Sequence, residues 1–206
     1  MKRSVSFASG LAGVASYLLF ALLAFLKFQG SFSPTKNWLS DLGSKELNPQ
    51  GAVFYNAGIV LTGVCLIVFF AGLGFWKIAE NKAQKILLPL TQIFGVMGSA
   101  AMVMSAVFPI TSTATHSFWS TGLYILLGTA FALSVAALRY HAQVPRWVLI
   151  IGAIVVVVNF VWCVALNIQP LEWATVGLFL LYVVLLSLGA KQWGLRSTGA
   201  SGASTV

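Results

Sequence analysis

A chain of 206 residues in which 59% are hydrophobic and only 8% are charged cannot fold as a soluble globular protein, because too few polar residues are present to cover its apolar bulk. Its net charge of +8 comes from basic residues that stand singly between long apolar stretches, which excludes a nucleic-acid-binding face. The composition therefore predicts an all-α polytopic membrane protein with lipid as its main solvent.

Six stretches without a charge are long enough to cross a membrane as helices, since an ionised side chain at mid-bilayer costs at least about 2.5 kcal/mol. The first follows a basic start and is expected to be retained as a helix, not cleaved as a signal peptide. In chain order, the predicted spans are 5–26, 50–76, 86–108, 118–138, 147–166 and 173–190. Residues 1–196 are thus predicted to form one six-helix transmembrane domain, followed by a disordered tail, 197–206.

Local signals support this division. Asn48-Pro49 before the second span resembles a helix cap followed by a proline at the first helical position, and Phe108-Pro109 ends the third span. Small residues recur at packing distance in the third span, beginning with Gly95 and Ser99, and allow close approach of neighbouring backbones. The third helix is therefore expected at the centre of the bundle.

Lysine and arginine are divided unevenly between the two ends of the predicted bundle. One end holds nine of them: Lys2, Arg3, Lys77, Lys82, Lys85, Arg139, Arg146, Lys191 and Arg196. The other end holds only three: Lys27, Lys36 and Lys45. Because basic residues are retained in the cytoplasm, we predict a multi-pass protein of the cytoplasmic (plasma) membrane with an N-in/C-in orientation.

The first predicted outer loop, about residues 27–49, is long for a connection. Trp38, Leu39 and Leu42 alternate in it with polar residues, so we expect the loop to fold back onto the bundle as a short interfacial helix or turn. Loops that pack in this way are frequent positions for binding and catalytic residues.

Other polar residues fall at the same end of the predicted bundle. His116 lies at the start of the fourth span, Glu172 lies at the start of the sixth, and Asn56 lies about one and a half turns inside the second. Together with Ser40 and Asp41 of the loop, they are expected to converge in an outward-facing polar pocket.

Three chemical interpretations of this pocket are open. As a lipid hydrolase or acyl-transfer enzyme, the protein would use Ser40 as nucleophile, His116 as base and Asp41 as the residue that orients the base. As a metal site, Asp41, His116 and Glu172 would hold zinc with one open position. As a binding site, the pocket would recognise a head group or small solute, with these substrate-binding candidates: Lys36, Trp38, Asn56 and Glu172, beside Asp41 and His116.

Each residue also has an ordinary structural explanation. Ser40 and Asp41 are suited to cap a turn in the loop. His116 would face water at a helix start, and Glu172 would be favoured near a helix N-terminus by the helix dipole. Asn56, inside a span, would join two helices through a hydrogen bond.

The stretch 37–43, Asn-Trp-Leu-Ser-Asp-Leu-Gly, followed by 54–58, Phe-Tyr-Asn-Ala-Gly, resembles a broad archaeal and bacterial six-span membrane family described as a domain of unknown function (the DUF-998 type). It is more distantly similar to the Frag1/DRAM/Sfk1 proteins, whose first loop carries a similar Ser-Asp-x-Gly turn. Some of those relatives act in remodelling the lipid of glycosylphosphatidylinositol anchors. The resemblance implies six spans, with Ser40, Asp41, Gly43 and Asn56 in the shared pattern, but this chain lacks the histidine set of ceramidase-like hydrolases.

We therefore expect a membrane protein whose outward-facing pocket binds or remodels a lipid head group. The alternatives are a small-solute transporter and a non-catalytic structural or partner-binding subunit. Membrane lipids are the expected partners, nucleic acid is excluded, and self-association as a homo-oligomer stays open.

Overall fold

The computed structural model describes residues 3–77 and 81–199, and the regular structure within these ranges is helical throughout. Six of the described helices are long and apolar enough to cross a membrane, which confirms the predicted all-α, six-span fold. The long helices are α1 (Arg3–Phe25), α2 (Ala52–Ala71), α3 (Lys82–Val107), α4 (Thr113–Leu138), α5 (Arg146–Phe160) and α6 (Gln169–Gly199). The short ones are the 3-10 segments η1 (Leu39–Gly43) and η2 (Gly72–Trp76) and the π-helical segment η3 (Val161–Leu166).

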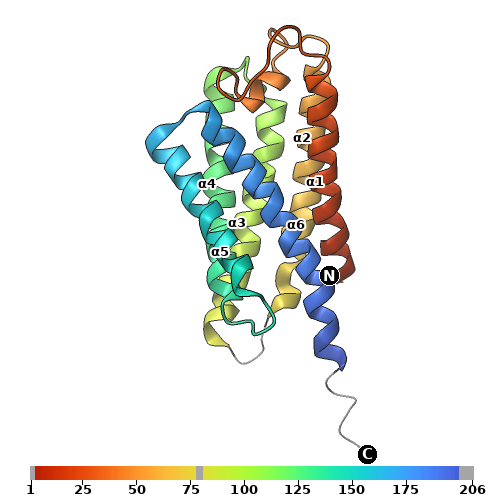
Figure 1. Cartoon of the computed structure of the whole chain (residues 1–206), viewed down its shortest axis with the longest axis vertical. Helices are drawn as coiled ribbons and strands as arrows, with labels where there is room; N and C mark the ends of the chain where they lie inside the picture. Colours follow the sequence, from red (N-terminus) through yellow and green to blue (C-terminus); the bar gives the residue numbers. More distant parts are fainter. Residues whose placement is uncertain (1–2, 78–80, 200–206) are drawn as a thin grey trace, which may run out of the picture.

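Both ends of the described chain lie at one end of the bundle, and the first loop covers the other (Figure 1). We call the end covered by the loop the outer end and the opposite end the inner end. Residues 200–206 of the tail expected to be disordered lie outside the described residues, while α6 continues to Gly199.

The helix α3 extends beyond the charge-free stretch that predicted its span. α3 begins at Lys82, four residues before the predicted span, and so includes Lys85. Its start is capped by Asn81, whose side chain accepts a hydrogen bond from the Gln84 N–H at 2.9 Å. A lysine stem reaches from the end of a helix into the interface, so helices extend beyond their charge-free portion.

The six helices form a closed ring in which each packs chiefly against its two neighbours, with α1 and α6 completing the circle. α3 packs between α2 and α4, so the expectation that it lies at the centre is wrong. Its small residues do permit close approach: a Cβ atom added to Gly98 would lie only 2.9 Å from the backbone nitrogen of Leu127 in α4. Such contacts hold neighbouring helices together around the ring, and side chains extend into its middle.

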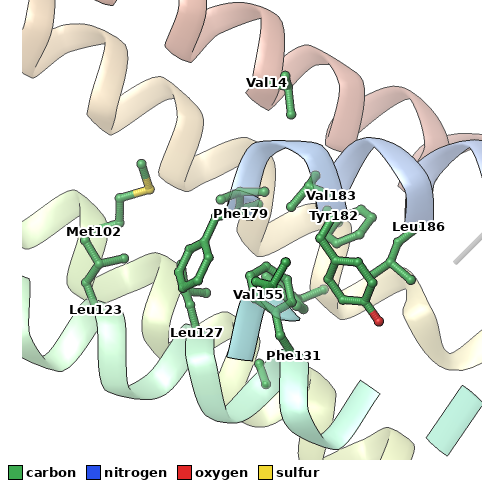
Figure 2. Packing of buried hydrophobic residues seen from close by; sticks show 14 of the residues in the cluster. Val14, Met102, Leu123, Leu127, Phe131, Val155, Phe179, Tyr182, Val183 and Leu186 are labelled. Atoms are coloured by element: carbon green, nitrogen blue, oxygen red, sulfur yellow. The ribbon is translucent and has the colours of Figure 1, made fainter. Parts of the chain in front are cut away.

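Toward the inner end, aromatic side chains fill the middle of the ring. Phe69, Phe70 and Tyr182 are fully buried. The ring of Phe131 lies 5.9 Å from that of Phe70 and 5.2 Å from that of Tyr182 between centroids. Figure 2 shows the side chains of α6, among them Phe179, directed toward Leu127 and Phe131 of α4. The inner half of the bundle is therefore a packed core.

Candidate functional site

A cavity of about 370 Å³ occupies the middle of the ring above this core. Its walls come from α1, α2, α3, α4, η3 and α6, and the first loop contributes at its outer end. The volume falls in the range of pockets that hold small molecules. The ring arrangement thus produces an internal site that no single helix would form.

The polarity of the cavity changes along its length. Its deep lining is apolar and includes Val14, Leu66, Phe131, Phe179 and Val183. Its outer lining carries hydroxyl, amide, imidazole and carboxyl groups, namely Ser40, Asn56, Thr113, His116, Ser117, Ser120, Thr121, Asn167 and Glu172. The cavity is therefore amphipathic, with its polar part beneath the first loop.

The first loop is fastened across the outer end by three hydrogen bonds, two from neighbouring residues of α6 and one from α2. Leu39 N–H donates to Glu172 Oε2 at 2.7 Å, Trp173 Nε1–H donates to the Asn37 carbonyl at 3.0 Å, and Asn56 Nδ2–H donates to the Gly43 carbonyl at 3.0 Å. The loop contains a short helix, η1, as predicted, and its position at a membrane interface stays a prediction. Trp38 and Ser40, on either side of Leu39, line the cavity.

Asn48 holds the end of the loop. Its fully buried side chain donates from Nδ2 to the carbonyls of Ala24 and Leu42, both at 3.0 Å, and its Oδ1 accepts the Gly51 N–H at 3.1 Å. The last contact has the spacing expected of a helix cap, although α2 itself begins at Ala52. Asn48 thereby joins the end of α1, the loop and the start of α2.

Asp41 lies within η1 and is absent from the cavity lining. Its Oδ2 accepts the Trp38 N–H at 3.0 Å and the Asn37 Nδ2–H at 3.4 Å, so it caps the turn. The side chain is 7% exposed, and this burial raises the pKa of Asp41 above its ordinary value, while both hydrogen bonds lower it. Its contacts are those of the structural explanation, and they stabilise the loop.

His116 projects from the first turn of α4 and lines the cavity. Its Nδ1 lies 3.0 Å from the Ser105 carbonyl and 2.9 Å from the Phe108 carbonyl. Because carbonyl oxygens only accept, Nδ1 carries the proton, and in the neutral ring Nε2 is left as an acceptor. His116 also satisfies carbonyls at the C-terminal end of α3, which have no partner within the helix.

The hydrogen bonds of residues 3–77 and 81–199 include none that joins Ser40, Asp41 and His116 to one another. Within the same ranges, no group of three metal-ligating side chains gathers, so Asp41, His116 and Glu172 are not assembled as a zinc site. Catalytic roles for Ser40, Asp41 and His116 stay predictions. Lys36, a predicted head-group contact, is exposed on the loop and lies outside the cavity lining.

Glu172 is the most deeply buried of the predicted site residues that line the cavity, with 6% of its surface exposed. In addition to the bond from Leu39, its Oε1 lies 3.5 Å from the hydroxyl oxygen of Tyr124. Tyr17 of α1 and Tyr55 of α2 are further buried tyrosines at this cavity. These three tyrosines also line the cavity.

The tyrosines were missed in the sequence, where an aromatic residue in a span is usually core. One signal was present: His116, Ser120 and Tyr124 follow one another at four-residue spacing, which places them on one face of a helix. Tyr55 precedes the suspected Asn56, but Tyr17 is marked by nothing in its surroundings.

Trp162 is a further wall residue that the sequence did not indicate. It lies in η3, and its ring centroid is 4.3 Å from that of Tyr124. The side chain is 7% exposed, and its buried Nε1–H has no hydrogen-bond partner. Single π-helical turns in α-helices are frequent at functional sites. An unpaired donor in a cavity wall is the kind of group that a bound molecule would satisfy.

Comparison with known proteins gives one match. The model of a family described as "Protein of unknown function (DUF998)" matches residues 11–190, which include all six spans at least in large part. No curated protein and no solved structure matches the chain. The resemblance to the Frag1/DRAM/Sfk1 proteins therefore stays a prediction.

Proposed function

We propose that this chain, which belongs to the DUF998 family of integral membrane proteins, binds one membrane amphiphile in its internal cavity. The polar head group would occupy the outer part of the cavity, beneath the first loop. The apolar tail would extend among the side chains of the deep lining. This assignment gives the predicted lipid-binding pocket a definite position.

The change of polarity within one cavity is the observation that carries the proposal. A small polar solute would leave the apolar surfaces of Leu66, Phe131 and Val183 unsatisfied. A purely apolar molecule would bury the hydroxyl, amide and carboxyl groups of the outer lining without partners, at a cost of roughly 1–3 kcal/mol for each group. An amphiphile matches both parts.

The packed inner half favours binding over the transporter alternative. Transport between the two faces needs a polar path that continues past the bilayer midplane. Here the fully buried Phe69 and Phe70 follow the cavity-lining Leu66 toward the inner end of α2. A purely structural subunit, in turn, would gain nothing from an amphipathic cavity, since a filled core is more stable.

Binding is also better supported than hydrolysis. A serine nucleophile needs a histidine base that a third group orients. In this chain Nδ1 of His116 is held by two backbone carbonyls, and Asp41 caps the loop. Ser40 and His116 both line the cavity, so they are available as head-group contacts.

A cavity-filling substitution tests the proposal. Ala106 lines the cavity and is 8% exposed, whereas its neighbour Val107 is 55% exposed on the outside of the same helix. We expect A106F to lose at least about tenfold of its lipid affinity, because the larger ring takes volume from the outer part of the cavity, where the head group would lie, while V107F retains the parental affinity. Native mass spectrometry of the purified chain in a nonionic detergent measures lipid that is retained and lipid that is added.

Equal retention of lipid by A106F, V107F and the parent chain would contradict the proposal. Thermal unfolding of both variants shows whether each remains folded, and because both introduce phenylalanine into α3, their difference reports on the cavity. If A106F does not fold, Ser120→Phe at the outer part of the lining provides the same test.

A further inference from the structure

Among the described residues, the cavity lining contains an acidic residue but no lysine or arginine. Glu172 is the one lining residue of the described chain with a carboxyl group. The two hydrogen-bond partners of Glu172, the Leu39 backbone and the Tyr124 hydroxyl, are neutral. While His116 is neutral, an ionised Glu172 therefore has no counter-charge from a cavity wall.

A buried carboxylate without a counter-charge has a large desolvation cost, and a positively charged occupant of the cavity offsets it. An anionic occupant would meet like charge and find no lysine or arginine side chain. The other acceptors of the outer lining act in the same direction, because Nε2 of neutral His116 and the Asn56 amide oxygen both accept N–H donors.

Four aromatic side chains line the same cavity as this carboxylate, and one of them, Tyr124, contacts it. Tyr17 and Tyr55 pack edge to face with 6.4 Å between ring centroids, and Tyr124 and Trp162 do so at 4.3 Å. All four line the cavity. Ring faces attract ammonium groups, and the attraction grows when water is excluded. A carboxylate among tyrosine and tryptophan rings is a favourable environment for an amine or quaternary ammonium ion.

We propose that the amphiphile bound in the cavity carries a cationic amino head group, with Glu172 as its counter-ion and the four aromatic residues as its surroundings. This inference rests on the proposed function and names the ligand class for the same site. Two sources supply such a head group: a single-chain amine and a zwitterionic phospholipid whose amine enters the cavity.

Three single-chain probes with the same tail isolate the head-group charge: hexadecylamine, hexadecanol and hexadecanoate. Titrated into the purified full-length chain and followed by native mass spectrometry, hexadecylamine should bind at least about tenfold more tightly than either of the others. Phosphatidylethanolamine compared with phosphatidylglycerol then distinguishes the two sources. A preference for phosphatidylethanolamine indicates the phospholipid, and a preference confined to hexadecylamine indicates the single-chain amine.

E172Q removes the charge while its amide oxygen still accepts the Leu39 N–H, so the fastening of the loop is kept. We expect E172Q to lose the preference for hexadecylamine over hexadecanol. E46Q is the control for the loss of one negative charge, because Glu46 is an exposed acid of the first loop that lies outside the cavity lining. Y124L retains the charge but removes a ring, and it should weaken hexadecylamine more than hexadecanol.

Equal binding of the three hexadecyl probes to the parent chain would overturn the head-group inference, as would an unchanged preference in both E172Q and Y124L. The amphiphile site itself would survive these results as long as A106F still abolishes binding. If A106F leaves the binding of every probe unchanged, the proposed function fails instead.

Discussion

Polar residues of the outer end are mostly occupied with backbone groups. Asn48, Asn56, Asp41 and His116 each bond backbone N–H or carbonyl groups that the first loop and a helix end leave without partners. Next to lipid such groups must be satisfied inside the protein. Residues that the sequence indicated as catalytic or binding groups therefore make hydrogen bonds that stabilise the backbone.

The buried capping carboxylate of Asp41 predicts a pH effect. The pKa of Asp41 in the folded chain is raised above the ordinary 3.8, so the folded chain binds the carboxyl proton more tightly than the unfolded chain does. The contribution of Asp41 to stability therefore falls as the pH rises from about 3.8 through the folded pKa. D41N does not ionise, and its amide oxygen can still accept the Trp38 N–H. Its unfolding midpoint should therefore rise relative to the parent chain between about pH 4 and neutrality.

Thermal unfolding in detergent across this pH range measures the difference, and E46Q corrects for the loss of one exposed negative charge in the same loop. A difference that is constant or shrinks with rising pH would show that burial does not dominate at Asp41.

Close approach of neighbouring helices is decided by which face a glycine occupies. Gly98 of α3 and Gly122 of α4 are both helical, and their sequence surroundings look equally suited to packing. A Cβ atom at Gly98 would lie 2.9 Å from the Leu127 backbone nitrogen, whereas one at Gly122 would have only the Ala101 Cβ within reach, at 4.0 Å. The first glycine is required by the α3–α4 contact, and the second is not.

G98A should therefore lower the free energy of unfolding by about 1–3 kcal/mol, because α3 and α4 must move apart. G122A should be neutral or stabilising by up to about 1 kcal/mol, since alanine is the better helix former. Chemical or thermal denaturation of the two variants beside the parent chain gives both values. Equal destabilisation by the two changes would mean that the contact at Gly98 does not limit helix approach.

For the whole molecule, the six spans bring residues from distant parts of the chain to one end. The bond between Leu39 and Glu172 joins positions 133 residues apart. An even number of spans returns both ends of the described chain to the inner end (Figure 1). In the sequence, nine of the twelve basic residues belong to this end. The placement of that end in the cytoplasm remains the prediction of the basic-residue distribution.

Cysteine accessibility tests this orientation. In a background without Cys65 and Cys163, T111C places a thiol in an exposed outer loop and A142C places one in an exposed inner loop. A membrane-impermeant maleimide should label T111C in intact cells, and A142C only after permeabilisation. The reverse pattern would invert the orientation and direct the cavity toward the cytoplasm, while the six-helix fold would stand.

The number of spans and the packed first loop were predictable because both follow from local properties. Charge cannot remain in hydrocarbon, so the charge-free stretches predict the helices. Trp38, Leu39 and Leu42 gave the loop an apolar side that had to be covered. Asn56 was suspected because a buried amide needs a partner, which proved to be the Gly43 carbonyl.

The position of each polar and aromatic side chain around the ring follows from tertiary packing alone. Glu172 and Lys36 were equal candidates in the sequence, yet one lines the cavity and the other is exposed. The tyrosines joined the site because the ring directs one face of each helix inward. Hydropathy is a property of the local sequence, but a cavity depends on the rotation of every helix about its axis, which is set by contacts such as that of Gly98 with Leu127.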